Sequence, residues 1–536
     1  MGFDRDTDLH VFNVTSAVAE AARKWGDRVV LHHYDTDATV TYEEVHSMSN
    51  RLGNRLRALG VEIENRIAIL MEDCPEWAYI FLGALKIGAV AAPLNTLLAE
   101  KDYAFYLADS RAKVLFVGAS LFDKIEGIIG SLPYLKQVVV FGDGSGVPRA
   151  GRIVDWESFV QDAPEELEIE PTFSNDMACF VYTSGSTGRP RAIVHSQNNM
   201  ALAALQPEKL RGVREGDIQF HVPKMYFNVC INGLLSTFYN GSSMVLVSGR
   251  PDPLTVLEVI RKYRPTMLTA PPTMLVRMIE TGKGAPHLTD LSSLKYIFCT
   301  GEALSPALFQ RFRELFGKTP YNCWGMQELN ASGIAWQFGE EVPPDKVGSN
   351  GRSTAPGVEV KIVDESGNEV PAGEKGELLV KAESLFLYYW HNPEETANRM
   401  YKGWFRAGDF FMRDVDRYYW YLGRSDEMVK IAGRQVFPAE VESTVGRHPA
   451  VLENAVVPIE NEMGLYELRT FVVLKEGYEP SPELASAIKG FVKDQLAPYK
   501  RPHHVAFVSD LPKTATGKIQ RFRLREEAVQ KEKVSQ

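Results

Sequence analysis

The chain has 536 residues, of which 45% are hydrophobic and 24% are charged, and its formal net charge is −10. This length exceeds one ordinary hydrophobic core, so at least two domains are expected, and the composition is typical of a globular protein rather than a disordered one. The acidic balance argues against a nucleic-acid partner, because binding to phosphate backbones requires a basic face.

The first hundred or so positions carry no evident export or membrane signal. The chain begins with a polar, acidic stretch that does not resemble a signal peptide. The longest apolar run, Ile80 to Leu94, is short for a membrane span and contains Lys86 and Pro93, so it predicts a buried helix followed by a short strand. Five scattered cysteines without zinc-ligand spacing indicate reduced core thiols in a cytoplasmic protein.

Strand-like and helix-like segments then alternate over most of the chain. Short apolar runs predict strands at Ala112–Val117, Gln137–Phe141, Ser243–Val247, Thr266–Ala270 and Leu294–Thr300. Helical patterns lie between several of them, and Ser305 with Pro306 predicts the N-cap and first residue of a helix. The alternation predicts an α/β fold with buried sheets.

A polar loop follows the apolar run Cys179–Tyr182, which itself predicts a strand. The loop and the two basic residues after it are Thr183, Ser184, Gly185, Ser186, Thr187, Gly188, Arg189 and Arg191. Glycines and small hydroxyl residues let backbone N–H groups approach an anion, and the arginines add positive charge, so the loop suits a polyphosphate. It is not a Walker P-loop, because no Gly-Lys-Ser/Thr follows. A flexible linker is the alternative, but here the loop lies between two apolar segments.

The character of the sequence changes after Leu422. The remaining residues predict short strands at Ala455–Pro458, Arg469–Leu474 and His504–Val508. They also predict one amphipathic helix at Glu483–Leu496. We therefore expect a boundary at Gly423–Asp426 that separates an N-terminal domain (1–424) from a smaller C-terminal domain (425–536).

The polar loop resembles the phosphate loop of the adenylate-forming enzymes, which include acyl- and aryl-CoA synthetases, nonribosomal peptide adenylation domains and firefly luciferases. Further segments recur in the family's order and cover most of the chain from Thr41 to Arg521. The resemblance implies a large N-terminal adenylating domain of several subdomains with mixed sheets, and a small mobile α+β lid. It also implies ATP, Mg2+ and CoA as cofactors and small molecules as partners, and it leaves the oligomeric state open.

By this resemblance, two segments lie along the adenine. The implied residues are Gly301, Glu302, Ala303, Trp324 and Gly325. Trp324 takes the place of the aromatic residue that stacks on adenine. Taken alone, the first segment equally suits a plain strand–helix turn.

Further positions match the ribose and phosphate contacts of the family. Asp409 resembles the carboxylate that accepts both ribose hydroxyls, and Arg424 resembles the arginine that contacts ribose and phosphate. The chain departs from the family pattern at Gln327 and Ala407, where threonine is usual. In the family, the threonine at the position of Gln327 contacts the α-phosphate, so Gln327 suggests a remodelled phosphate pocket.

The implied catalytic residues are Glu328, Arg424 and Lys518. Glu328 resembles the acid that holds Mg2+ on the phosphates, and an oxygen ligand suits that ion. Lys518 resembles the lysine that reaches the acid and the α-phosphate, although a lone lysine near a C-terminus is usually a solvated charge. Asp426 falls at the hinge position of the family, and Gly433 falls in the CoA channel, where a side chain would obstruct a narrow tunnel.

This set of residues suits one reaction in two steps. A carboxylate attacks the α-phosphorus of ATP, and because both partners are anionic, positive charge must offset their repulsion. Pyrophosphate leaves, and the resulting acyl-adenylate must be shielded from water until the CoA thiol attacks its carbonyl and AMP leaves. The implied activity is that of an AMP-forming acid–CoA ligase.

The acid is suggested by the segment Phe220–Asn228. Lys224 followed by aromatic residues is similar to the benzoate-CoA ligases, and we place Tyr226, Phe227 and Met326 in the acid pocket. A core helix packed with aromatic residues is the alternative interpretation. Lys224 either pairs with a carboxylate or points to solvent.

A benzoate-like or alicyclic acid is therefore preferred, with a medium-chain fatty acid as the second choice. Three alternatives to this function stay open: an adenylation enzyme that loads a separate carrier protein, a luciferase-like oxygenase, and a nucleotide-sensing protein without turnover. The sequence does not reveal the pathway.

Overall fold

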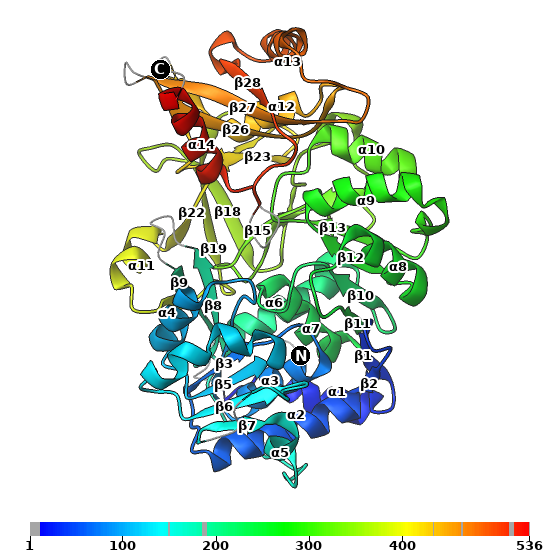
Figure 1. Ribbon diagram of the computed structural model, residues 1–536, viewed down its shortest axis with the longest axis vertical. Helices are drawn as coiled ribbons and strands as arrows, with labels where there is room; N and C mark the ends of the chain where they lie inside the picture. Colours follow the sequence, from blue (N-terminus) through cyan, green and yellow to red (C-terminus); the bar gives the residue numbers. More distant parts are fainter. Residues whose placement is uncertain are drawn as a thin grey trace.

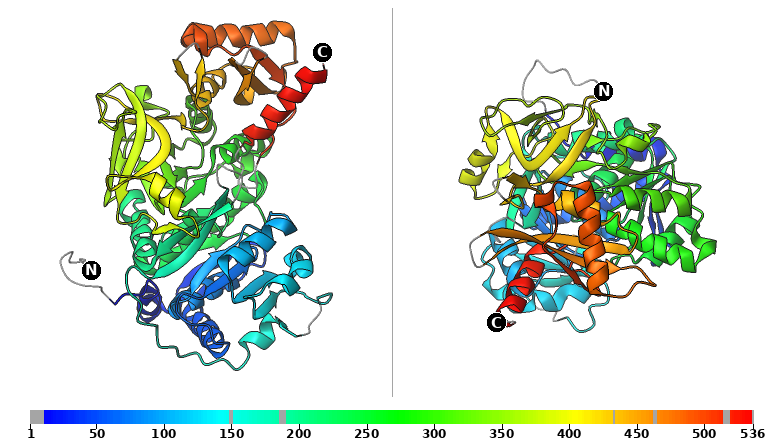
Figure 2. Two further views of the ribbon diagram at one scale, coloured as in Figure 1. Left: turned by 90° about the vertical axis from the view of Figure 1, so that its left-hand side faces the viewer. Right: turned by 90° about the horizontal axis from the view of Figure 1, so that it is seen from above.

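The structure is a computed structural model that describes residues 11–147, 151–184, 190–431, 434–461, 465–513 and 519–534. The first large sheet lies in the lower part of the molecule, and the helices of the second one (green) reach up at the right. A third sheet (yellow-green) stands at mid-height on the left, and the C-terminal strands and helices form the top (Figure 1). A view from the side shows the same stacking (Figure 2).

The first large sheet carries the predicted phosphate loop. Its strands, in spatial order, are β20 (Tyr388–Tyr389), β9 (Pro190–Ser196), β8 (Met177–Ser184), β4 (Val90–Pro93), β3 (Arg66–Leu70), β5 (Val114–Gly118), β6 (Gln137–Phe141) and β7 (Ile153–Asp155). The strands from β8 to β7 are parallel, whereas β8, β9 and β20 pair in antiparallel fashion. The central strands are almost entirely buried, as expected for a sheet covered on both faces.

Helices from the first half of the chain pack around this sheet and beside the second one. They are α1 (Ser16–Trp25), α2 (Tyr42–Ala58), α3 (Pro75–Lys86), α4 (Glu100–Ser110), α5 (Trp156–Val160) and α6 (Gln197–Arg211). Helix α2 begins with a capping box between Thr41 and Glu44, which satisfies backbone N–H groups at its first turn. Apart from Glu76 and Lys86, the residues of α3 are apolar on every side, and all except Glu76 are buried, so this helix lies inside the domain.

The second large sheet is parallel except at one edge. Its order is β14 (Pro320–Asn322), β13 (Tyr296–Cys299), β12 (Met267–Ala270), β10 (Ile218–His221), β11 (Ser243–Leu246), β1 (Val29–His33) and β2 (Thr39–Thr41), the last pair being antiparallel. The parallel strands are connected by α7 (Asn228–Asn240), α8 (Pro253–Tyr263), α9 (Pro272–Gly284) and α10 (Pro306–Phe316).

A third, antiparallel sheet follows in the chain. It contains β18 (Val358–Val363), β19 (Lys375–Ala382), β22 (Trp404–Arg413) and β21 (Met400–Tyr401), with β23 (Tyr419–Arg424) paired to β22. A small sheet of β15 (Trp324–Met326), β16 (Ala331–Ala335) and β17 (Ser353–Thr354) connects it to the second large sheet, and α11 (Pro393–Arg399) precedes β21.

The C-terminal part packs around cores made of its own residues. Its strands and helices are β24 (Val429–Ile431), β25 (Arg434–Val436), α12 (Pro438–Val445), β26 (Val451–Glu460), β27 (Tyr466–Leu474), α13 (Pro482–Gln495), β28 (His504–Phe507) and α14 (Arg521–Val534). One core joins α12 and α13 to the sheet through residues such as Val441, Val456 and Ile488. A second core lies under α14 and includes Leu524.

The predicted α/β fold class is confirmed. Each strand expected in the first three hundred residues lies within two residues of an observed strand, and α10 begins at Pro306 with the Ser305 hydroxyl accepting from the N–H of Leu308. The apolar run from Ile80 forms part of α3 and then β4. Within the described residues, no helix is both long enough and apolar enough to cross a membrane.

Candidate active site

The predicted phosphate loop joins β8 to β9. Thr183 and Ser184 are the last residues of β8. The next four positions of the loop, Gly185, Ser186, Thr187 and Gly188, lie outside the described residues. Thr183 is paired with Arg191 across the hairpin, and its hydroxyl oxygen is buried without a hydrogen-bond partner among the described residues. A buried hydroxyl in that state can donate to an incoming phosphate oxygen.

Glu328, the predicted metal ligand, is held by a strand of the same sheet. The carboxylate is buried and accepts a 2.6 Å hydrogen bond from the hydroxyl of Tyr389 on β20. Arg191 stacks over the Tyr389 ring at 4.5 Å and forms a 2.5 Å ion pair with Glu395. Burial and the Glu328 carboxylate raise the pKa of Tyr389, so the phenol stays protonated and can donate to Glu328.

The donor set at Glu328 fits a magnesium ion that arrives on a nucleotide. Mg2+ takes only one or two carboxylates from proteins and fills its other positions with phosphate and water oxygens. Among the described residues, no group of three or more His, Cys, Asp or Glu side chains is placed to hold a metal ion alone. A single buried carboxylate therefore suits an ion whose remaining ligands come from the phosphates.

Three predicted nucleotide residues are in contact with one another. Trp324 donates its indole N–H to Asp409 Oδ2 at 2.7 Å, and Arg424 lies opposite Asp409 across β22 and β23, with Nη1 3.6 Å from Oδ1. Asp426 is 3.4 Å from Nε of Arg424. Burial opposes the charged form of Arg424, but the two acids raise its pKa. The Trp324 ring is 6% exposed and packs edge-on against Phe411, and its stacking on adenine stays a prediction.

The loop Gly301–Ala303 follows β13 and faces the C-terminal part. Gly301 has a φ of 98°, in the left-handed region that favours glycine. Glu302 Oε1 accepts a hydrogen bond from the backbone N–H of Ile519 at 3.4 Å. Lys518, the residue before it, lies outside the described residues. The sequence neighbour of the predicted catalytic lysine thus contacts the predicted adenine loop.

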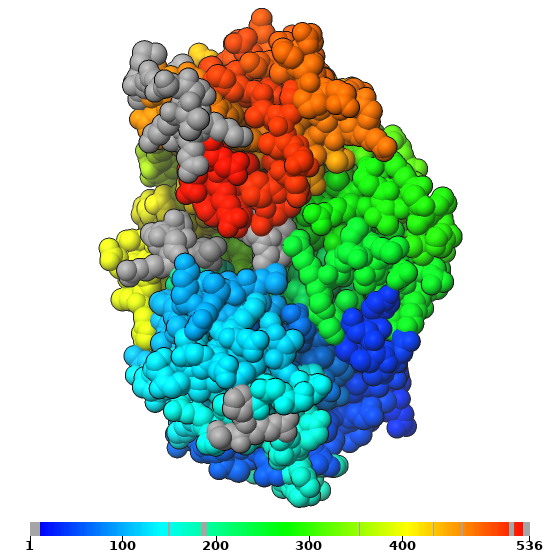
Figure 3. Space-filling view, in the orientation of Figure 1, coloured from blue at the N-terminus to red at the C-terminus, as the bar shows by residue number. Residues whose placement is uncertain are grey.

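The C-terminal part rests directly on the body beside this loop. Figure 3 shows its orange and red surface against the green surface of the body. Burial, followed by the nearby charges of Arg311 and Lys283, lowers the pKa of Lys475, so basic groups from both parts meet there. Gly433, the predicted channel residue, lies outside the described residues. These contacts define one orientation of the C-terminal part on the body.

Gln327 connects the predicted phosphate segment to α7. The backbone N–H of Asn228 points to Gln327 Oε1 at 3.4 Å, and Asn228 Nδ2 donates to the Gln327 carbonyl oxygen at 2.9 Å. Phe227, the N-cap residue of α7, supplies no side-chain cap, so Gln327 takes that role. The bend before it requires glycine, because a Cβ at Gly325 would lie 2.5 Å from the carbonyl oxygen of Ala331.

The predicted acid-pocket residues are less closely connected. Tyr226 is buried, and its hydroxyl lies near Asp73; burial, and then that acid, raise the pKa of Tyr226. Phe227 is half-buried, with its ring centroid 4.7 Å from that of Tyr226. Met326 packs against a cluster that includes Phe386. Tyr226 and Met326 therefore have different neighbours, and a pocket that they share stays a prediction.

Two residues that the sequence does not single out have evident roles in the structure. Asp73 lies 2.9 Å from Nζ of Lys224, so the lysine pairs with a carboxylate rather than pointing to solvent. The signal available for Asp73 is its position just after β3, where residues of parallel sheets often meet ligands. Tyr389, the donor to Glu328, lies in a run of aromatic residues without a distinguishing local pattern.

Comparison with known proteins gives consistent results over most of the chain. Residues 18–390 match the family model of AMP-binding enzymes, and residues 440–518 match that of the AMP-binding enzyme C-terminal domain. The chain is 36% identical to a 3-hydroxybenzoate–CoA ligase from Aromatoleum sp. (strain CIB) over 490 residues, 91% of each protein. It is 36% identical to a benzoate–CoA ligase from Thauera aromatica over 92% of each protein. An anthranilate CoA ligase, AuaEII, solved in complex with anthranoyl-AMP, superimposes with a TM-score of 0.88 at 34% identity and 98% coverage of both chains.

Proposed function

Because the chain belongs to the family of AMP-binding enzymes, we infer that it is an ATP-dependent, AMP-forming acid–CoA ligase that works through an acyl-adenylate. Its cofactors are ATP, Mg2+ and CoA. We propose further that its acid is a benzoate-like or alicyclic monocarboxylate.

One observation carries the proposal: a connected series of contacts runs from the phosphate-loop hairpin to the predicted ribose acid. Strand β9 pairs with β20, where Tyr389 donates to Glu328. Four residues before Glu328, Trp324 donates to Asp409, which faces Arg424. Groups suited to phosphate, metal and ribose thus lie along one path, in the order in which ATP would present its parts.

We propose the following roles in adenylation. Asp409 binds the ribose hydroxyls, and Arg424 holds ribose and phosphate at the same edge. Glu328 supplies an oxygen ligand to the Mg2+ of the nucleotide, which offsets negative charge on the phosphates when bound. Lys518 neutralises the approaching carboxylate and the α-phosphate, since two anions must otherwise meet.

We propose that residues 425–536 form a lid that turns at Asp426 on the N-terminal domain, residues 1–424. The contact between Ile519 and Glu302 supports a placement suited to adenylation, because Lys518 is adjacent to Ile519 in the chain. In the second step the lid must bring Gly433 to the channel that admits the CoA thiol. A rotation between the two half-reactions meets both needs with one small domain.

Two observations support the proposed acid. The ligases compared above are named for benzoate, 3-hydroxybenzoate and anthranilate, all of them ring-bearing acids. The lysine of the predicted acid segment, Lys224, is paired with Asp73, and this leaves the half-buried Phe227 to contact an apolar substrate. Burial of a ring against such a wall would supply most of the affinity.

We propose a cytoplasmic location. All five cysteines (Cys74, Cys179, Cys230, Cys299 and Cys323) are buried free thiols. Reduced thiols of this kind are typical of proteins kept in a reducing compartment.

The test is pyrophosphate release from ATP with a panel of carboxylic acids, followed by detection of the CoA thioester. We expect benzoate or cyclohexanecarboxylate to lead hexanoate, octanoate and acetate. A lead by acetate or octanoate would refute the ring acid and leave the ligase class standing. Pyrophosphate release without a CoA thioester would favour a carrier protein as acceptor, and no release with any acid would refute the function.

A further inference from the structure

The loop between β10 and α7 is anchored by a lysine whose charge is used entirely inside the protein. Lys224 Nζ donates to the carbonyl oxygens of Val247 (2.6 Å), Ser248 (2.6 Å) and Gly249 (3.1 Å). It also lies 2.9 Å from Asp73 Oδ2, and both side chains are 8% exposed. An ammonium group has three N–H donors, so these partners satisfy it fully.

Asp73 holds the same loop at a second point. Its Oδ1 accepts a 3.1 Å hydrogen bond from the backbone N–H of Met225, the residue after Lys224. One carboxylate on the β3–α3 connection therefore fixes two consecutive residues of the β10–α7 loop. Because β3 and β10 belong to different sheets, the pair joins the two large sheets at this point.

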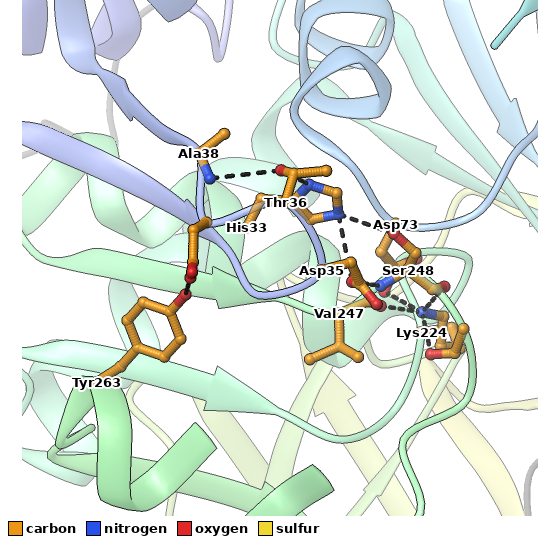
Figure 4. A network of polar contacts seen from close by, with 11 residues as sticks. His33, Asp35, Thr36, Ala38, Asp73, Lys224, Val247, Ser248 and Tyr263 are labelled. Carbon is orange, nitrogen blue, oxygen red and sulfur yellow. Dashed lines mark hydrogen bonds and ion pairs between the residues drawn. The ribbon is translucent and has the colours of Figure 1, made fainter. Parts of the chain in front are cut away.

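An outer layer of polar contacts supports the carbonyl oxygens that surround the lysine (Figure 4). His33, at the end of β1, lies 2.8 Å from the Ser248 hydroxyl and 2.8 Å from the Thr36 hydroxyl. Asp35 accepts from the backbone N–H of Ser248 at 2.7 Å. The segment that faces Lys224 is thus itself held in place, which makes the lysine a fixed anchor rather than an adaptable surface charge.

Backbone hydrogen bonds connect Lys224 to the residues of the predicted acid pocket. The carbonyl oxygen of Lys224 accepts from the N–H of Phe227 at 2.9 Å, and the carbonyl oxygen of Phe227 accepts from Cys230 in the first turn of α7. On the other side, Asn228 is bonded to Gln327. Tyr226 and Phe227 therefore span a short segment that is fixed at both ends, and the buried ion pair sets its position at one of them.

We propose that Asp73 and Lys224 are a positioning pair, which holds the segment Met225–Asn228 in the place where it binds the carboxylic acid. Neither residue touches the acid. The inference rests on the proposed function, because it takes this segment as the acid-binding wall. Loss of the pair should weaken acid binding selectively, since the nucleotide residues Asp409, Trp324 and Arg424 do not depend on it.

The test begins with wild-type enzyme and the acid panel, which decides the proposed function by itself. The first variant is Asp73→Asn, which keeps an acceptor for the Met225 N–H and removes the ion pair. We expect the KM for the acid to rise about tenfold or more, because a buried hydrogen bond between charged groups is lost, and the KM for ATP to stay within about twofold. Equal increases in both KM values, or an unchanged KM for the acid, would overturn the proposal.

A double variant separates positioning from general stability. Lys224→Met alone leaves Asp73 as an unpaired buried charge and should lower the melting temperature, whereas Lys224→Met with Asp73→Asn removes that charge. We expect the melting temperature to recover in the double variant while the KM for the acid stays raised. If the KM for the acid recovers together with the melting temperature, the pair has a structural role alone.

Lys346→Met is a matched control. Lys346 is similarly buried (11% exposed) and pairs with Asp414 (3.1 Å) and Asp416 (2.6 Å) at the turn between β22 and β23. We expect this variant to lower the melting temperature and to leave the KM for the acid unchanged. A raised KM for the acid in Lys346→Met would show that any loss of a buried ion pair has this effect, and would overturn the assignment to Lys224.

Discussion

The nucleotide end and the acid end of the candidate site differ in the partners of their buried charged residues. At the nucleotide end, the side chain of Asp409 is 8% exposed but faces Arg424, which is 36% exposed, and the buried Glu328 carboxylate accepts a hydrogen bond from the neutral hydroxyl of Tyr389. At the acid end, Lys224 and Asp73 are each 8% exposed, and the ammonium group is surrounded by backbone carbonyl oxygens.

The difference follows from the ligands that the two ends are proposed to take. A polyphosphate with its metal ion needs protein charges that it can reach, whereas a ring-bearing acid gains affinity from apolar walls and loses it beside an unpaired charge. Burying an ion pair costs desolvation free energy, so its presence beside the proposed acid pocket is better explained by the position that it imposes than by added stability. The predictions below test this division, from the largest expected effect on activity to the smallest.

The largest effect is expected for Lys518→Ala. The variant should lose at least about 3–4 kcal/mol of transition-state stabilisation in adenylation, because a cation at the reacting phosphorus is removed. Conversion of supplied acyl-adenylate and CoA to thioester should be largely spared. Measurement of the two half-reactions separately checks this, and equal losses in both would contradict the assignment of Lys518 to the nucleotide end.

The next effect is expected for Asp409→Ala. This change removes the predicted ribose acceptor and leaves the indole N–H of Trp324 and one side of Arg424 without their partner. We expect the KM for ATP to rise by an amount equivalent to about 2–3 kcal/mol, with the KM for the acid nearly constant. Asp364→Ala, in a turn of the same sheet, serves as the control. A parallel rise in both KM values would contradict the assignment of Asp409 to the nucleotide end alone.

Tyr389→Phe tests how Tyr389 supports Glu328, the predicted metal ligand. It removes the 2.6 Å hydrogen bond to Glu328 and keeps the ring under Arg191. A loss of about 1.5 kcal/mol, close to tenfold in kcat, is expected, together with a higher Mg2+ requirement. Tyr388→Phe changes the exposed neighbouring tyrosine and should behave as wild type. An unchanged Mg2+ requirement in Tyr389→Phe would argue against Glu328 as the ligand.

Phe227→Ala tests whether the ring of Phe227 determines acid selectivity at the acid end. Removing this half-buried ring should reduce kcat/KM for benzoate relative to hexanoate by about 1–2 kcal/mol, because flat apolar contact is lost. Tyr226→Phe, whose lost hydroxyl lies near Asp73 and Thr96, should leave the acid profile nearly unchanged. The specificity profile of both variants checks the prediction, and a larger shift in Tyr226→Phe would reverse the placement of the two rings.

The smallest effect on activity is expected for Lys86→Met, which contrasts a second buried lysine with Lys224. In the described structure the partners of Lys86 Nζ are neutral, Asn50 and His46, and burial lowers the pKa of Lys86 to about 7. Between pH 7 and its ordinary pKa the unfolded chain binds more protons than the folded protein, so Lys86 makes stability rise with pH across this window.

Replacing Lys86 should therefore flatten that rise, by up to about 1.4 kcal/mol per pH unit in the free energy of unfolding. Melting temperatures at pH 7, 8 and 9 check this, and profiles that run parallel for the variant and the wild type would contradict it. Acid and ATP kinetics should be unchanged at pH 8, since Lys86 is the last residue of α3 and its partners, His46 and Asn50, are not among the predicted site residues.

The sequence by itself determined the class of reaction and most of the secondary structure. The phosphate loop at Thr183–Gly188 and the segment around Glu328 are local patterns whose chemistry can be interpreted without a fold. The strands of the large sheets are short apolar runs because both faces are covered, and this makes them visible in the sequence. The domain boundary and the roles of the site residues stay predictions.

The tertiary structure alone decided which charged groups meet. Lys224 is followed by aromatic residues in the sequence, but its partner Asp73 lies on the connection after a strand of the other large sheet, about 150 residues earlier in the chain. Tyr389 reaches Glu328 because β20 pairs with the phosphate-loop strand β9. Pairings of this kind depend on how sheets pack against each other, and no local periodicity or spacing encodes them.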